Sequence, residues 1–217
     1  MSTVRAVLWD MDGTLIDSEE FHWISWRETL QKEGVPITRE QFLATFGQRN
    51  DSMIPQLLGT MATPERIEKI STAKEKLYRD LVRRHGMKPL PGVAVWLERL
   101  HETGWLQAIG SAAPCANIEV VLEALSAAHL FQAIVSAEDV QHGKPDPQVY
   151  LVAASRLGAL PERSIRRGRR RCGSTSRTSR RHAQHRRQPQ RKAAAGRYRR
   201  AVARATASKR IRSTFDS

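Results

Sequence analysis

Cysteine is scarce in this sequence, and long apolar segments are missing. Only Cys115 and Cys172 occur among the 217 residues, and they lie far apart in the chain. Two such cysteines make neither a metal-binding spacing nor a disulfide framework. No apolar run approaches the length that crosses a bilayer, and no signal-peptide core follows the basic residue near the N-terminus. We therefore expect a cytoplasmic globular protein with no membrane partner.

Acidic residues are almost absent from the last quarter of the chain. Residues 166–217 contain 19 Lys and Arg against one acid, Asp216, which gives a net charge of +18. Residues 1–165 contain 17 basic and 21 acidic residues, a net charge of −4. The overall charge of +14 is therefore the sum of two regions that differ in composition, a slightly acidic one and a strongly basic one.

A short apolar run at residues 4–9 has the pattern of a strand that is buried on both faces. Asp10, Asp12 and Gly13 follow it directly, and a glycine there permits the chain to turn. Such a loop can hold one carboxylate as a nucleophile and the next as a proton donor. The alternative is an Asp-rich turn that caps a helix beginning near Asp17.

The segment from residue 17 to residue 86 shows only helical periodicity. Apolar side chains recur at helical spacing over 18–32 and 64–84, and shorter helices are expected from Thr38 and over 53–58. We therefore predict a helical insert directly after the first strand.

Strands and helices alternate after this insert. The expected strands are 105–111 and 131–136. Three helices are expected, one from Pro91 to near Gly104, one over 117–127, and one that follows the segment 143–147 and runs through Leu157. This alternation predicts an α/β fold with a doubly wound parallel sheet, in which ligands bind beyond the carboxyl ends of the strands.

Asp10, Ser111 and Lys144 all lie at or soon after those strand ends. The Ser111 hydroxyl and the backbone N–H groups after it would suit a phosphate. A lysine at 144 would offset the charge between an aspartate nucleophile and a dianionic substrate. Ser111 could instead cap the next helix, and Lys144 could be an ordinary loop lysine.

The string D-M-D-G-T-L-I-D-S from Asp10, together with G-K-P-D-P around Lys144, resembles the signatures of the haloacid dehalogenase-like phosphohydrolases. The resemblance implies that Asp10 attacks phosphorus to form an aspartyl-phosphate. Asp12 would protonate the leaving group and then activate water, while Ser111 would bind the phosphate and Lys144 would offset charge. It also implies a small phosphorylated metabolite as substrate and Mg²⁺ as cofactor, with Asp10 and Asp12 as metal ligands.

The helical insert resembles the cap of the β-phosphoglucomutase-like subfamily, through D-S-E-E-F-H, R-N-D-S and the pair Lys74 and Tyr78. By this resemblance His22 assists proton transfer at the hinge, Arg49 grips a distal phosphate and Lys74 reaches a sugar hydroxyl. Each of these three side chains could instead be an ordinary surface residue. Closure of such a cap would exclude water and select the substrate.

The resemblance divides the chain into three parts. These are an incomplete core (1–16 plus 87–165), a helical cap (17–86) and an Arg-rich tail (166–217). In the family a buried strand ending in Mg²⁺-binding acids follows this point, whereas here the sequence continues R-R-G-R-R-R-C-G.

The missing strand and acids lead to several expectations. The first strand should have an exposed edge, folding should be marginal and Mg²⁺ affinity should be low. Glu138 and Asp139 are not expected to replace the missing ligands.

Three interpretations of residues 166–217 are a nucleic-acid-binding arm, a disordered extension and out-of-frame translation. We favour the last, because the composition changes where a strand should begin. The predicted function is Mg²⁺-dependent phosphoryl transfer from a small phosphate monoester, impaired by the lost metal motif, with no preference between phosphatase and mutase. The alternative is a catalytically inactive scaffold whose tail, if it is genuine, binds nucleic acid.

Overall fold

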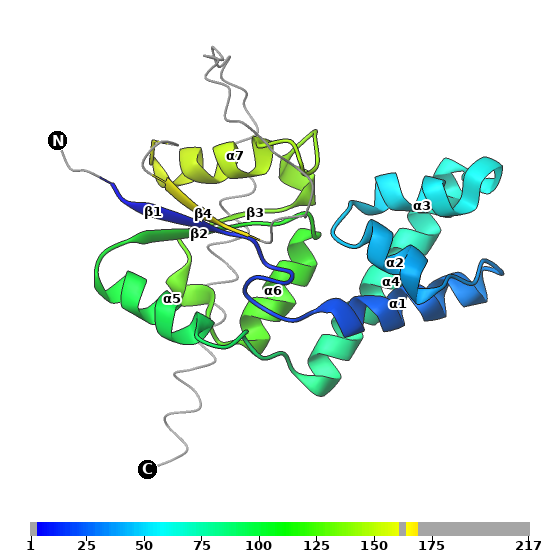
Figure 1. Ribbon diagram of the computed structural model, residues 1–217, viewed down its shortest axis with the longest axis horizontal. Coiled ribbons are helices and arrows are strands. Elements are labelled where there is room, and N and C mark those ends of the chain that lie inside the picture. The colour runs from blue at the N-terminus through cyan, green and yellow to red at the C-terminus, as the bar shows by residue number, and fades with distance from the viewer. Residues whose placement is uncertain (1–3, 161–163, 169–217) are drawn as a thin grey trace.

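A computed structural model of the chain describes residues 4–160 and 164–168. Its strands form one parallel sheet in the order β3-β2-β1-β4 (Figure 1). They are β1 (Ala6–Trp9), β2 (Leu106–Gly110), β3 (Ala133–Val135) and β4 (Ser164–Arg167). The helices are α1 (Glu19–Lys32), α2 (Arg39–Thr45), α3 (Asn50–Leu58), α4 (Pro64–His85), α5 (Val93–Glu102), α6 (Cys115–Ala124) and α7 (Gln148–Leu157). Short 3₁₀ turns lie at Gly59–Met61, Ala128–Leu130 and Ala137–Asp139.

Helices cover both faces of the sheet, with α7 on one side and α5 and α6 on the other (Figure 1). Val7 and Trp9 of β1 pack in the cluster that contains α5 and α6, whereas Ala6 and Leu8 pack against α7. Both faces of β1 are therefore buried, which explains why its sequence is apolar without alternation. The predicted doubly wound α/β fold is confirmed.

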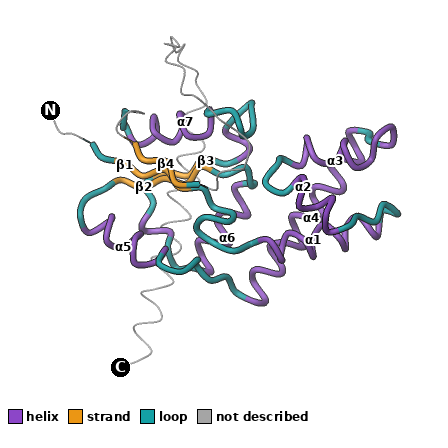
Figure 2. Tube along the Cα trace, in the orientation of Figure 1, coloured by secondary structure: helices purple, strands orange, loops and turns teal. Residues whose placement is uncertain are grey.

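Helices α1 to α4 follow β1 in the chain and group beside the sheet (Figure 2). They have a hydrophobic cluster of their own, formed by Trp26, Leu30, Ile37, Phe42, Met53, Ile54, Leu58 and Ile70. The two longest predicted helices agree with α1 and α4 to within a residue at each end. Helix α3 begins at Asn50 rather than at residue 53. The sequence pattern missed its first turn because that turn is polar and carries no apolar periodicity.

The prediction that no strand follows residue 165, which would leave one edge of the first strand exposed, is wrong. Strand β4 pairs in parallel with the full length of β1, from Ala6 opposite Ser164 to Trp9 opposite Arg167. It also crosses the predicted boundary between core and tail at residue 165. Pairing of this kind uses backbone N–H and C=O groups, which every residue but proline supplies. The side chains of β4 add little cover, and Ile165 is 49% exposed.

The remaining residues of the predicted tail, 169–217, lie outside the described residues. Within residues 4–160 and 164–168, no helix combines the length and hydrophobicity that a bilayer crossing requires.

Candidate active site

Three of the predicted site residues meet at the carboxyl ends of neighbouring strands. Asp10 follows β1, Ser111 follows β2, and Lys144 lies on the loop between β3 and α7. The backbone N–H of Ser111 donates to the carbonyl of Val135 at 2.9 Å, which extends the sheet pairing beyond β2. The parallel sheet thus brings together residues that are far apart in the sequence.

The contact between Asp10 and Lys144 is the centre of this site. The Lys144 Nζ donates to Asp10 Oδ1 at 2.5 Å across 134 positions of sequence. The backbone N–H of Met11 donates to the same oxygen at 3.0 Å. Among the described residues both hydrogen bonds to this carboxylate reach Oδ1, so Oδ2 is the oxygen left for other chemistry.

Burial has the largest effect on the pKa of both groups. It raises the pKa of the Asp10 carboxyl, and the charge of Lys144 offsets part of that rise. Burial alone would lower the pKa of Lys144, but the Asp10 carboxylate outweighs it and the pKa is raised. The short contact between opposite charges therefore favours the ionised form of each group against the effect of burial.

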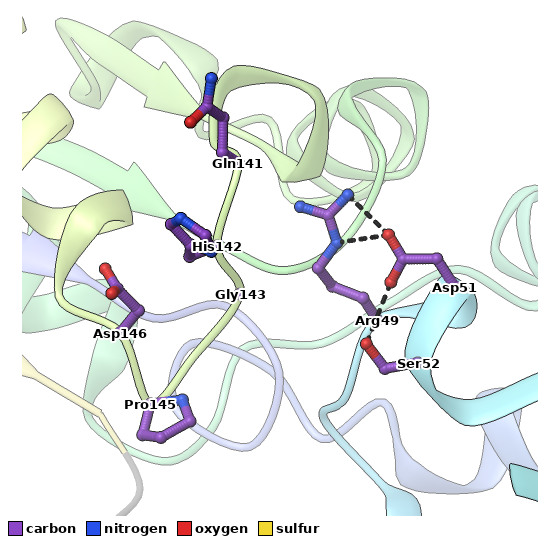
Figure 3. A pocket seen from close by; sticks show the side chains of 8 residues that line it. All are labelled: Arg49, Asp51, Ser52, Gln141, His142, Gly143, Pro145 and Asp146. Carbon is purple, nitrogen blue, oxygen red and sulfur yellow. Dashed lines mark hydrogen bonds and ion pairs between the residues drawn. The ribbon is translucent and has the colours of Figure 1, made fainter.

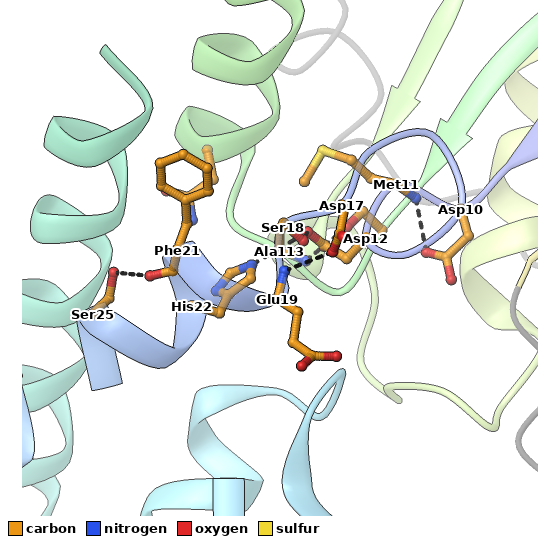
Figure 4. Close-up of polar contacts among 12 residues, drawn as sticks. Asp10, Met11, Asp12, Asp17, Ser18, Glu19, Phe21, His22, Ser25 and Ala113 are labelled. Atoms are coloured by element: carbon orange, nitrogen blue, oxygen red, sulfur yellow. Dashed lines mark hydrogen bonds and ion pairs between the residues drawn. The ribbon is translucent and has the colours of Figure 1, made fainter. Parts of the chain in front are cut away.

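Asp12 lies on the loop that links β1 to α1, where it faces the start of the helix (Figure 4). Gly13 allows the turn with a φ of 70°, as the sequence predicts. The Ser18 hydroxyl donates to Asp12 Oδ1 at 2.6 Å, and His22 Nε2 lies 3.3 Å from the same oxygen. Ser18 occupies the N-cap position of α1 but makes no side-chain cap bond, and its hydroxyl points to Asp12 instead.

The surroundings of Asp12 favour its charged form. Burial raises the pKa of this carboxyl, but the hydrogen bonds from His22 and Ser18 and the charge of Lys144 outweigh burial and leave the pKa lowered. The charged form of Asp12 is therefore the stable one at neutral pH, and Asp12 must take up a proton before it can protonate a leaving group.

A chain of buried polar side chains continues from Asp12 into the cap. His22 Nδ1 lies 3.0 Å from Lys74 Nζ, and Lys74 donates to Glu75 Oε1 at 2.9 Å. The His22 ring stacks on Tyr78 with ring centroids 4.2 Å apart. The predicted residues His22 and Lys74 are thus brought together next to Asp12, although they are 52 positions apart.

Ser111 is buried, and its hydroxyl oxygen accepts from the backbone N–H of Ala113 at 3.0 Å. The hydroxyl thus stabilises the turn between β2 and α6, whereas the N-cap position of α6 itself is taken by Pro114. Its predicted phosphate contact stays a prediction.

Arg49 lies between cap and core and is engaged on both sides. Its Nη1 donates to the carbonyls of Ala137 and Val140, both at 3.1 Å, and its Nη2 lies 2.9 Å from Asp51 Oδ2. Figure 3 shows the guanidinium turned toward Asp51. A Cβ at Gly143 would lie 2.7 Å from Arg49 Cδ, so glycine is required for this approach. The predicted grip of Arg49 on a distal phosphate stays a prediction.

Two hollows lie between cap and core. The larger, about 660 Å³, is an open groove at the outer end of the interface, lined by Arg49, Asp51, Ser52, Gln141, His142, Gly143, Pro145 and Asp146 (Figure 3). The smaller, about 50 Å³, is lined by residues that include Asp12, His22, Lys74 and Glu75. The smaller cavity holds the candidate proton-transfer groups Asp12 and His22, whereas Asp10, Ser111 and Lys144 line neither of these two hollows.

Oxygen ligands for a metal are few at this site. No group of three or more His, Cys, Asp or Glu side chains in the described parts of the chain is arranged to hold a metal ion. Asp139 accepts hydrogen bonds from Arg156 and Ser136, and Glu138 accepts from the backbone N–H of Cys115. Both acids are thus engaged in other contacts, and the expectation that they do not replace the missing metal ligands stays a prediction.

Sequence reasoning missed Ser18, Glu75 and Tyr150 as neighbours of the site. Lys144 Nζ lies 5.4 Å from the centroid of the Tyr150 ring, and the Arg166 guanidinium of β4 lies 4.8 Å from it. Ser18 ends the D-M-D-G-T-L-I-D-S string, which gave it no expected contact with Asp12. No motif marks Glu75 or Tyr150, and the one available signal for Glu75 is its place next to Lys74. Their roles depend on neighbours that are distant in the sequence.

The nucleophile candidate, its paired lysine and the sheet order together match one known family. The sequence profile of the haloacid dehalogenase-like hydrolases matches residues 7–168. The chain belongs to this family. This match ends one residue beyond β4, so the basic residues from 169 onward fall outside it.

Similarity to individual relatives agrees with the assignment of this chain to the family. The chain is 33% identical over 171 residues to hexitol phosphatase B of Escherichia coli, covering 74% of each chain. It is 26% identical over 164 residues to the β-phosphoglucomutase of Bacillus subtilis, covering 73% of this chain and 72% of that enzyme. The predicted family and its β-phosphoglucomutase-like subfamily are confirmed.

The fold of the hydrolase is also similar to that of solved structures. CbbY from Rhodobacter sphaeroides, solved in complex with phosphate, superposes with a TM-score of 0.68 at 27% identity. The superposition covers 76% of this chain and 77% of CbbY.

Proposed function

We propose that this hydrolase transfers the phosphoryl group of a small phosphate monoester to Asp10. Before the first step Asp12 takes up a proton from solvent. In the first step an Asp10 oxygen bonds to phosphorus while the bond from phosphorus to the leaving oxygen breaks, and Asp12 gives that oxygen its proton. In the second step a water, or a second substrate hydroxyl, attacks phosphorus and gives its proton to Asp12, which frees the Asp10 carboxylate. The observation that carries this proposal is the 2.5 Å contact between Asp10 and Lys144.

Lys144 and Ser111 would position the substrate. The Lys144 ammonium lowers the repulsion between the Asp10 carboxylate and a dianionic phosphate. The phosphate would bind among the Ser111 hydroxyl and nearby backbone N–H groups. Lys74 and Arg49 in the cap would contact the rest of the substrate, and the cap would exclude water when closed.

A phosphorylated carbohydrate is the substrate class that the relatives support, since they include a hexitol phosphatase and a β-phosphoglucomutase. Lys74 and Asn50 line the small cavity beside Asp12 and carry hydrogen-bond donors of the kind that sugar hydroxyls accept.

Mg²⁺ is generally used by phosphatases and phosphomutases of this family, and it would supply positive charge to the transferred phosphoryl group. Asp10 and Asp12 would hold it, but the fit is incomplete, because the described residues add no further carboxylate to this pair. The sequence after β4 carries no acid before Asp216. We therefore propose that Mg²⁺ affinity and turnover are both impaired in this chain.

The test is hydrolysis of p-nitrophenyl phosphate, a hexitol phosphate and glucose 1-phosphate by the full chain, with Mg²⁺ and with EDTA. We expect slow turnover that Asp10→Asn reduces to the uncatalysed rate, because the amide cannot act as the nucleophile. The matched control is Asp17→Asn, which changes an exposed acid on the same loop and should leave the rate unchanged. A rate that Asp10→Asn does not alter would contradict the proposal.

The proposed impairment is tested by a second variant. A chain in which the segment after Ser164 is replaced by an apolar strand ending in two acids should gain activity in Mg²⁺ but not in EDTA. Equal activity with and without these acids would show that they are not what limits turnover.

A second candidate function, the binding of nucleic acid, has one supporting observation, the charge of +18 on residues 166–217. Arg-rich segments bind phosphate backbones through counterion release, so retention should fall steeply as salt rises. The comparison is between the full chain and a chain that ends at Gly168. Equal retention of both on duplex DNA at low salt would remove this candidate.

A further inference from the structure

Glu75 is a buried carboxylate on α4 that lies at the boundary between cap and core. Only 6% of the residue is exposed. Its Oε1 accepts from Asn50 Nδ2 at 2.8 Å and from Lys74 Nζ at 2.9 Å, both within the cap. Its Oε2 accepts from Asn117 Nδ2 on α6, which packs against the sheet. One carboxylate thus satisfies donors from three helices.

The Asn117 side chain is fixed at both ends by α4. Arg79, one helical turn after Glu75, donates from Nη1 to Asn117 Oδ1 at 3.0 Å. Because Asn117 is fully buried, its amide must keep both hydrogen bonds. The clamp by Glu75 and Arg79 therefore sets how the cap helix α4 docks on α6 of the core.

Glu75 also provides the counter-charge for Lys74. The Lys74 residue is 2% exposed, and an ammonium buried to this extent is costly without an anion beside it. The Trp26 and Tyr78 rings lie 5.1 Å and 5.6 Å from Nζ and give weaker support. The Glu75 carboxylate is the one anion in direct contact with this ammonium among the described residues.

The charge of Lys74 decides the tautomer of His22. A lysine ammonium has three donors and no acceptor, so the His22 Nδ1 that faces it at 3.0 Å must be the acceptor. The ring hydrogen of a neutral His22 is then on Nε2, where it donates to Asp12 Oδ1 at 3.3 Å.

We infer that Glu75 is a positioning residue that acts on His22 through Lys74. When α4 of the cap is docked on α6 through Asn117, Glu75 keeps Lys74 charged, and Lys74 holds His22 in the tautomer whose Nε2–H faces Asp12. The inference rests on the proposed function, in which Asp12 is the acid and base. Glu75 itself touches no reacting atom. It connects the docking of the cap to the hydrogen bond that orients Asp12.

The experiment measures the ¹⁵N resonances of the His22 ring in the full chain, which identify the tautomer without any turnover. We expect a single Nε2–H tautomer in the natural sequence and its loss to a mixture in Glu75→Gln, whose neutral amide no longer balances Lys74. Glu75→Asp keeps the negative charge and should keep the single tautomer. The matched control, Glu68→Gln, changes an exposed acid on the same helix and should leave the His22 resonances unmoved.

Two outcomes would overturn the inference, an Nδ1–H tautomer in the natural sequence and an unchanged tautomer in Glu75→Gln. If Glu75→Gln does not fold, the double variant Lys74→Met with Glu75→Leu removes both charges and leaves no unpaired ion. Retention of the single tautomer in that variant would also overturn the inference. Failure of the proposed function would appear differently, as absent Asp10-dependent hydrolysis with the His22 resonances as expected.

Discussion

Asp139 lies just after β3, where its carboxylate serves the structure of the loop. Its Oδ2 accepts from the Ser136 backbone N–H at 2.9 Å and from the Ser136 hydroxyl at 2.8 Å, and Oδ1 pairs with Arg156 at 2.5 Å. Burial raises the pKa of Asp139, but the bonds from Arg156 and Ser136 outweigh it and leave the pKa below 3.8. The sequence places this acid near the site, whereas its partners give it a structural role.

The effect of Asp139 on stability should depend on pH. Because its pKa is lower in the folded than in the unfolded chain, its contribution is present above about pH 3.8 and is lost as the pH falls through the folded value. We expect Asp139→Asn to lower the free energy of unfolding by about 1–3 kcal/mol at pH 7 and by much less near pH 3. Urea unfolding at both pH values measures this, with Glu102→Gln as an exposed control on α5. An equal loss at both pH values would contradict the prediction.

At the scale of the element, the start of α2 shows how a local motif fixes a helix end. The Thr38 hydroxyl accepts from the Gln41 backbone N–H at 3.3 Å, and the Gln41 side chain accepts from the Thr38 backbone N–H at 2.8 Å. This reciprocal capping box satisfies donors that the helix itself leaves unpaired. The sequence predicts the beginning of this helix at Thr38, and the structure agrees.

Removal of this cap should weaken the helical cap as a whole. We expect Thr38→Ala to lower the free energy of unfolding by about 1 kcal/mol, since the hydroxyl acceptor is lost, and Thr38→Ser to lower it much less. Thermal or urea unfolding measures the difference. Thr60→Ala, in an exposed 3₁₀ turn, is the control and should have almost no effect. A loss as large for Thr60→Ala would show that the cap bond is not responsible.

At the scale of the whole molecule, β4 determines whether the central strand β1 is paired on both sides. Its four residues pair with β1 along the whole strand, although their side chains are largely exposed. The expectation of marginal folding assumed that this edge was open. With β4 in place, the backbone groups on that side of β1 have partners.

A comparison of two shortened chains tests the contribution of β4. A chain that ends at Gly168 keeps β4, and a chain that ends at Leu160 lacks it. Each ladder hydrogen bond contributes about 1 kcal/mol, so we expect the shorter chain to unfold at a temperature lower by roughly 5–15 °C. Differential scanning calorimetry measures both midpoints. Equal midpoints would mean that β4 does not stabilise the sheet.

The sequence by itself determined the fold class and the main positions of the site. Residues 6–9 are apolar throughout, which indicates a strand buried on both faces, and the periodicity of the long helices is local information. The Asp10 and Lys144 motifs indicated the family before any distance was known.

Only the tertiary structure decided how several side chains and one strand are used. Strand β4 forms through backbone pairing, which leaves no apolar pattern to read, and Ser18 turns from its helix end to Asp12. Glu75 binds Asn117 across 42 positions, and Arg49 binds the core carbonyl of Ala137 across 88. Such contacts depend on which distant groups the fold places within hydrogen-bonding range, and local sequence patterns carry no record of those distances.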